Sequence, residues 1–145
     1  MRKTPRSLAL VVTLLVLTLS ACLPVTVPGL RNVDGQTWSA RFEVEVRPAN
    51  VAAIRLPVDL TLTFSQRLHD VTAQAKLQYD TGIIRLQTGS LVDLRGRLGF
   101  DDHLDLQSSS NALTFEGYFV GNKLVGTVSI GGLVPVTNVT FTKAR

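Results

Sequence analysis

The strict alternation of apolar and polar side chains is the feature that most limits how this chain can fold. Seven consecutive even positions between residues 52 and 64 are apolar, and most of the odd positions between them are polar. Residues 38–46 and 71–79 repeat the pattern. Successive side chains of a strand point to opposite faces, whereas a helix with this spacing would carry apolar groups all around its circumference. The pattern therefore predicts strands with one buried face and one solvent face.

Shorter alternating segments continue to the C-terminus, with turn-forming residues between them, as at Asp80-Thr81-Gly82 and Gly121-Asn122. Parallel strands need crossovers of a dozen or more residues, for which the sequence leaves no room. Residues 37–145 are therefore predicted to form an all-β domain, an antiparallel up-and-down meander of about eight or nine strands. Its apolar face must be covered by closure into a small barrel, which we expect, or by folding into a β-sandwich, the alternative. Such a barrel resembles the calycin group in architecture, without a shared ligand motif.

Two local irregularities interrupt the alternation. The last predicted strand, residues 134–143, changes phase after Val136, and a bulge near Thr137 and Asn138 would explain the change. Three segments also carry a glycine on the face that their neighbours bury, at Gly96, Gly117 and Gly126. A missing side chain lets a strand bend sharply, or lets another backbone or a ligand approach. These glycines therefore indicate either the coiling that closes a barrel or the lining of a cavity for an apolar ligand.

Residues 1–21 have the features of a secretory signal peptide. Arg2, Lys3 and Arg6 precede an almost purely apolar run over residues 7–19, which small residues follow. The run is shorter than the ~20 residues that a spanning helix needs. We therefore expect export rather than a transmembrane anchor.

The segment Leu19-Ser20-Ala21-Cys22 resembles the lipobox of bacterial lipoproteins. The resemblance implies that the Cys22 thiol carries diacylglycerol, with acyl chains such as palmitate, and that the bond between Ala21 and Cys22 is cleaved. It also implies a place in the cell envelope, with the chain anchored to a bacterial membrane and facing the periplasm or the exterior. Leu23 stands where an Asp tends to retain such proteins in the inner membrane, which favours the outer membrane in an organism that has one.

Residues 22–36 are predicted to be a lipidated N-terminus and a flexible tether, because Pro24, Pro28, Gly29 and Gly35 break regular structure. At ~3.1 Å per residue, such a tether could span roughly 40 Å.

The charge of the chain gives no support to nucleic-acid binding. The full sequence has a net charge of +4, but Arg2, Lys3 and Arg6 belong to the leader, which leaves 12 basic against 11 acidic residues. Basic side chains interleave with acidic ones and form no stripe. One cysteine and two histidines exclude an internal disulfide and a zinc site built only from Cys and His. We expect no cofactor.

The densest polar cluster is Asp101-Asp102-His103-Leu104-Asp105. Its three carboxylates and imidazole make Asp101, Asp102, His103 and Asp105 weak candidates for a divalent-cation site, since hard cations want several oxygen ligands. The two adjacent Asp residues stand between predicted strands, where Asp is common in turns. A hairpin turn is therefore the favoured interpretation, and no metal is predicted.

Three functional hypotheses remain. The first is a non-enzymatic, membrane-anchored envelope lipoprotein that binds an apolar small molecule or lipid in the barrel interior. The second is a structural or assembly partner that contacts another envelope protein through a sheet edge or face, for which the outward-phased Tyr118 is a candidate contact. The third is an enzyme, for which no catalytic residue can be named, because Ser108–Ser110 lack the Gly-x-Ser-x-Gly context of a nucleophile.

Overall fold

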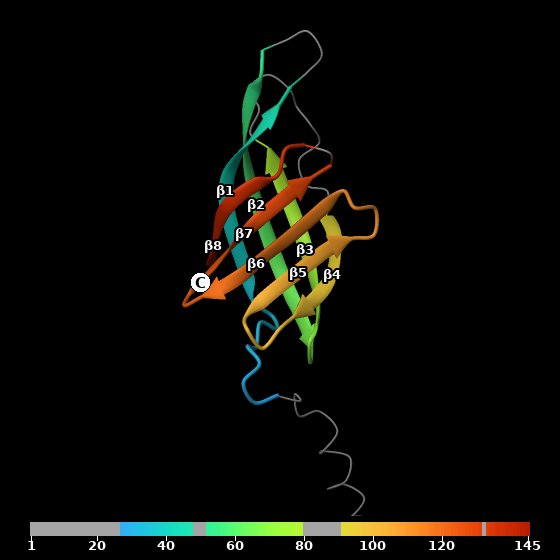
Figure 1. Ribbon diagram of the computed structural model, residues 1–145, viewed down its shortest axis with the longest axis vertical. Coiled ribbons are helices and arrows are strands. Elements are labelled where there is room, and N and C mark those ends of the chain that lie inside the picture. The colour runs from blue at the N-terminus through green and yellow to red at the C-terminus, as the bar shows by residue number, and fades with distance from the viewer. Residues whose placement is uncertain (1–26, 48–51, 80–90, 132) are drawn as a thin grey trace, which may run out of the picture.

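Eight antiparallel strands close into a barrel in the computed structural model, which describes residues 27–47, 52–79, 91–131 and 133–145 (Figure 1). The strands are β1 (Thr37–Val46), β2 (Ile54–Arg67), β3 (Asp70–Tyr79), β4 (Leu91–Leu98), β5 (His103–Ser108), β6 (Leu113–Val120), β7 (Lys123–Ile130) and β8 (Val136–Lys143). Each strand pairs with the next along the chain. The prediction of an antiparallel up-and-down barrel is confirmed, and the β-sandwich alternative is wrong. One of the shorter alternating segments of the sequence, at Ile84 and Leu86 after the predicted turn Asp80-Thr81-Gly82, lies outside the described residues.

The alternation of the sequence becomes the inside and the outside of the barrel. Along β3 every second side chain is buried and the next is exposed. The core consists of these inward side chains from all eight strands, and several of the largest are fully buried, among them Phe115 and Phe141. The two rings meet edge to face with centroids 5.4 Å apart, a favourable arrangement for aromatic pairs. Within the part of the chain described, no helix is long and apolar enough to cross a membrane.

Closure of the barrel depends on the pairing of β1 with β8. Their register joins Trp38 to Lys143 and Ser39 to Thr142, and the Ala144 amide donates to the Thr37 carbonyl at 2.8 Å. These contacts lie at the end of the barrel that also carries the β2–β3, β4–β5 and β6–β7 turns. We call this the lower end; it lies toward the bottom of Figure 1. The opposite end, with the connections that follow β1, β3, β5 and β7, is the upper end.

The phase change in the last strand is a β-bulge, as the sequence predicted. Gly126 pairs with Val139, whereas Val128 pairs with Val136, so β8 has one residue more than β7 in this interval. Asn138, inside the bulge, adopts a φ of 57°, a left-handed conformation that Asn tolerates better than most residues.

The glycines of the inner face serve close packing. Gly117 and Gly126 pair across β6 and β7, and a Cβ atom at either position would lie within 2.8 Å of the Phe115 ring. A Cβ atom at Gly96 would collide with the backbone carbonyl of Asp105 on β5. The close backbone approach at all three glycines fits the interpretation as barrel closure, and Phe115 fills the space beside Gly117 and Gly126 that a ligand cavity would need.

The sequence pattern predicts a flexible tether over residues 22–36, but residues 27–36 pack across the lower end of the barrel, and residues 22–26 lie outside the described residues. Val33 is fully buried, and its amide donates to Oε1 of Gln66 on β2 at 2.7 Å. Pro28 and Gly29 do form a turn, but a turn residue does not prevent the next residues from covering an open core. We call residues 27–36 the strap.

Candidate functional site

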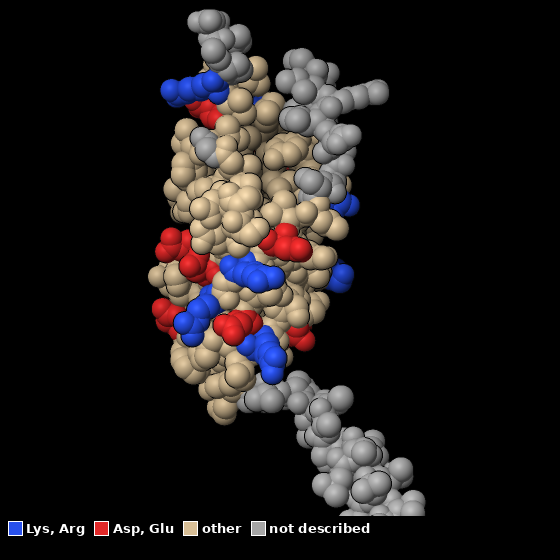
Figure 2. Space-filling view, turned by 90° about the vertical axis from the view of Figure 1, so that its right-hand side faces the viewer, with Lys and Arg blue, Asp and Glu red and all other residues tan. Residues whose placement is uncertain are grey.

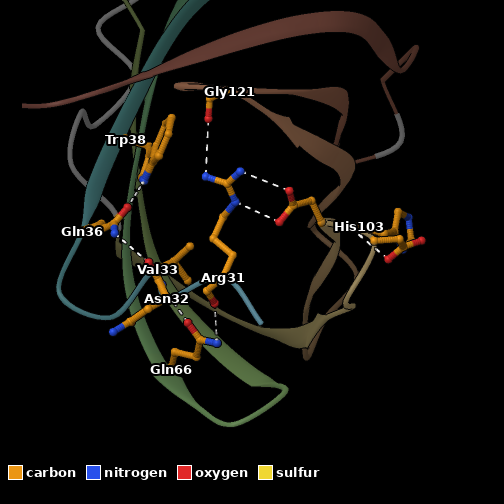
Figure 3. A network of polar contacts seen from close by, with 10 residues as sticks. Arg31, Asn32, Val33, Gln36, Trp38, Gln66, His103 and Gly121 are labelled. Carbon is orange, nitrogen blue, oxygen red and sulfur yellow. Dashed lines mark hydrogen bonds and ion pairs between the residues drawn. The ribbon is translucent and has the colours of Figure 1, made fainter. Parts of the chain in front are cut away.

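The strap is held by backbone contacts with β2. The Gly35 amide donates to the Phe64 carbonyl and the Phe64 amide to the Gln36 carbonyl, both at 2.9 Å. The side-chain amide of Gln66 donates to the Arg31 carbonyl at 3.0 Å while its oxygen accepts from Val33 (Figure 3). One glutamine thus satisfies two backbone groups of the strap, which are costly to leave unpaired in a half-buried position.

A bidentate ion pair fastens the strap to the β4–β5 turn (Figure 3). Arg31 donates from Nε and from a terminal nitrogen to the two carboxylate oxygens of Asp102, at 2.8 and 3.1 Å. The hydrogen bonds from Arg31 lower the pKa of Asp102, and those to Asp102 raise the pKa of Arg31. The guanidinium also lies 5.0 Å from the centroid of the Phe119 ring, within cation–π range. The ion pair with Asp102, the contact of Arg31 with the Phe119 ring and the buried side chain of Val33 together hold the strap over the lower end.

A hollow of about 660 Å³ opens beside this closure, between the strap, Trp38, the β6–β7 turn and the end of β8. The Trp38 ring is 3% exposed and meets Phe119 edge to face at 5.4 Å. Its indole nitrogen donates to the Gln36 side chain at 3.2 Å. All residues that line the hollow lie at the lower end, with polar side chains such as Gln36 and Asn122 around the buried Trp38, so the hollow belongs to the surface of the lower end.

The polar cluster at residues 101–105 is divided among separate contacts. Asp101 accepts the His103 amide at 3.2 Å, as expected of a turn. Asp102 is engaged by Arg31, and Asp105 is exposed on β5 opposite Arg97. Among the described residues, no three His, Cys, Asp or Glu side chains are grouped to hold a metal ion.

The two histidines lie on different hairpins. His103 Nε2 is buried, has no hydrogen-bond partner among the described residues and lies 3.4 Å from the Glu116 carboxylate on β6. Its ring packs on Tyr118, which is 51% exposed. His69 Nδ1 lies 2.8 Å from the Leu98 carbonyl. Ser108 is buried near the upper end, where its hydroxyl accepts the Leu113 amide at 3.0 Å. The structure thus brings neither histidine to this serine.

The upper end carries a belt of apolar side chains that are neither core nor solvent-exposed. They are half-buried and pack against the core; we call them the upper mouth: Val46, Leu56, Tyr79, Val92, Ile130, Leu133 and Val136. Three large apolar side chains on the rim are more exposed, namely Ile54, Leu91 and Val134. Burial raises the pKa of Tyr79. A tyrosine phenol is already neutral at pH 7 at its ordinary pKa, so Tyr79 can donate a hydrogen bond in these apolar surroundings.

A second hollow, of about 380 Å³, crosses the outer face of β2, β3 and β4. Its outward side chains include Ser65, Thr72, Gln74, Asp93 and Arg95. The sequence alone indicates neither this groove nor the upper mouth, because the burial of a side chain near a strand end depends on which strands lie beside it. The pairing registers contain that information, and the sequence of a single strand does not.

The predicted lipidation residue Cys22 and its neighbour Ala21 lie outside the described residues. No protein-family model matches the chain, and a search of curated proteins finds no significant relative.

Proposed function

We propose that this chain is a non-enzymatic lipoprotein of the bacterial cell envelope, anchored through Cys22, that binds an apolar small molecule or one acyl chain of a lipid at the upper mouth of its barrel. The observation that carries the ligand proposal is the half-buried apolar belt at the upper end. Ligand sites in proteins are mostly apolar concave surfaces with a few polar groups that fix orientation. The mouth has this composition, with Tyr79 as its polar group.

The site is placed at the mouth rather than deep inside the barrel because side chains fill the deeper layers. Leu94, Leu104 and Leu106 are fully buried, and Phe115 occupies the space beside Gly117 and Gly126. Protein interiors packed in this way leave few voids larger than a water molecule. A ligand that entered from the upper end would therefore contact the first apolar layer and stop there.

The proposal is tested by titrating the purified full mature protein with a fluorescent fatty acid. We choose Leu133→Asp and Val92→Asp as mouth variants, because both side chains are half-buried at the edge of the core and not in its centre. Val125→Asp, on the half-exposed outer face of β7, is the matched control. A charge placed in the mouth should weaken binding at least tenfold, since a carboxylate is strongly disfavoured in an apolar site.

The outcome that contradicts a ligand site at the mouth is equal binding by the control and the two mouth variants. Absence of saturable binding by the wild-type protein would contradict it as well. Circular dichroism and the fluorescence of Trp38, which lies at the other end of the barrel, establish that each variant is folded before titration.

The second candidate function is assembly with another envelope protein. The observation that favours it is the polar groove on the outer face of β2, β3 and β4, since a protein partner can bind an outer sheet surface without entering the core. Substitution of Gln74 and Arg95 by Ala should remove a cross-linked partner in cells under this function. The same pair of changes should leave fatty-acid binding unchanged if the mouth is the functional site.

A further inference from the structure

Three strand connections at the lower end present exposed apolar side chains. Leu68 lies in the β2–β3 turn, Phe100 in the β4–β5 turn and Val120 at the end of β6, and they are 45%, 61% and 63% exposed. Turn positions of soluble surfaces usually hold polar or small residues. Exposed apolar side chains gathered at one end of a barrel make that end a candidate contact surface. Because Ile54, Leu91 and Val134 are exposed at the upper end as well, the position of the strap has to decide between the two ends.

The three apolar tips are joined to one another. The Leu98 amide donates to the His69 carbonyl at 2.8 Å, which links the β4–β5 and β2–β3 turns. The His69 ring also meets Phe100 edge to face, with centroids 4.7 Å apart. The Phe119 amide donates to the Asp102 carbonyl at 3.0 Å, which links the end of β6 to the β4–β5 turn. The connections that carry these side chains thus lie together at the lower end of the barrel, joined by the contacts above (Figure 1).

The strap leads to the same surface, and the predicted lipid attachment site is close to it in the sequence. Arg31 of the strap contacts Asp102 and the Gly121 carbonyl at the lower end. Five residue steps separate Cys22 from Val27, where the described strap begins. A fully extended chain spans at most ~3.6 Å per residue, so these steps reach no more than about 18 Å. A lipid on Cys22 therefore keeps the lower end, and not the upper end, near the bilayer.

We propose that the lower end is a membrane-seating surface, in which Leu68, Phe100 and Val120 enter the interfacial region of the bilayer that holds the lipid anchor. The seating rests on the proposed lipidation of Cys22. Side chains need to enter only 5–10 Å to reach the boundary between headgroups and acyl chains. The upper mouth then faces away from the membrane, where it can exchange a ligand with the surrounding compartment.

Apolar contacts, and not net charge, attract the lower end to the bilayer in this proposal. Basic residues near the lower end, such as Arg67, Arg97 and Lys143, are accompanied by the acidic Asp70 and Asp101. Figure 2 shows basic and acidic side chains interspersed over the lower half of one face, without a basic patch. Seating should therefore need no anionic lipid and should persist at high salt, unlike binding that depends on a polybasic segment.

The experiment uses two reporter positions with equal exposure at opposite ends of the barrel. Val120 and Val134 are both 63% exposed, and Cys22 is the only native cysteine. In the mature lipidated protein its thiol is blocked, so V120C or V134C can each be labelled alone with a fluorophore. The labelled proteins are incorporated into phosphatidylcholine vesicles that contain a lipid with a quencher near the headgroup.

We expect several-fold stronger quenching of the label at Val120 than of the label at Val134, and loss of that difference when Leu68 and Phe100 are both replaced by Ser. Protein that fails to float with the vesicles overturns the lipid anchor and the seating together. Protein that floats but shows equal quenching at both positions overturns the seating alone. Quenching at Val120 that appears only with phosphatidylglycerol, or disappears in 1 M NaCl, overturns the apolar basis of the seating.

Discussion

The ion pair between Arg31 and Asp102 makes a quantitative prediction about how firmly the strap closes the barrel. We choose Arg31→Gln, Asp102→Asn and the double variant. Asp102 has a φ of 63°, and Asn tolerates this left-handed conformation, whereas Ala would add backbone strain. The substitutions therefore remove charge while the turn geometry is kept.

The magnitude follows from the exposure of the pair. The side chains of Arg31 and Asp102 are 31% and 35% exposed, so solvent screens much of their attraction. We expect a coupling free energy of about 0.5–1 kcal/mol, toward the upper part of the range for exposed pairs because the contact is bidentate. Arg31→Gln alone should cost about 1–2 kcal/mol, since it also removes the contact with the Phe119 ring.

The sign of the pH dependence follows from the lowered pKa of Asp102. Because folding lowers the pKa of this carboxyl from 3.8, the folded state favours the ionised form. The stabilisation is complete above the unfolded-state pKa and is lost as pH falls through the lower folded-state value. The pKa of Arg31 is raised by the same contact, so the guanidinium stays charged throughout this range.

The assay is urea-induced unfolding, monitored by tryptophan fluorescence. Trp38 is the only tryptophan, and it is buried next to Phe119 at the end that the strap closes. The double-mutant cycle isolates the coupling free energy of Arg31 and Asp102. Arg31→Gln removes the contact with Phe119 whether residue 102 is Asp or Asn, so that loss cancels. A coupling of zero at pH 7, a coupling above about 2 kcal/mol, or a coupling unchanged at pH 2 and in 1 M NaCl would each refute the reasoning.

Two further predictions concern the anchor and the core. Replacement of Cys22 by Ser should release the protein from the membrane fraction and abolish incorporation of labelled fatty acid; membrane association with the wild-type mass would show that Cys22 carries no lipid. Gly126→Ala should destabilise the barrel by about 1–3 kcal/mol, because the new Cβ would lie 2.7 Å from the Gly117 Cα and 2.8 Å from the Phe115 ring. An unchanged urea midpoint would mean that the two strands are not as closely packed as the structure shows.

The strands could be predicted from the sequence because their signal is local. The alternation over residues 52–64 becomes the alternating burial of β2, and the change of phase after Val136 becomes the bulge opposite Thr127. Each of these features depends only on neighbouring residues in one strand. Barrel closure has no such local signal, because the contact between Trp38 and Lys143 joins the two ends of the domain.

The contacts of the strap could not be predicted from the sequence. Arg31 and Asp102 are 71 residues apart, and each looks like an ordinary loop residue when its local sequence is considered alone. Pro28 and Gly29 correctly indicate a turn, but the burial of Val33 depends on the open lower end of a barrel that forms from later strands. The half-burial of the side chains at the upper mouth likewise depends on strands that are distant in the sequence.

The most direct test of the proposed binding function is native mass spectrometry of the mature protein purified from its own host in mild detergent. A barrel with a functional mouth should carry a bound apolar molecule or lipid, released by collisional activation, in addition to the covalent lipid on Cys22. Leu133→Asp should lose that molecule, while Val125→Asp should keep it. A wild-type protein with no bound molecule, or one bound equally by both variants, would contradict a ligand site at the upper mouth.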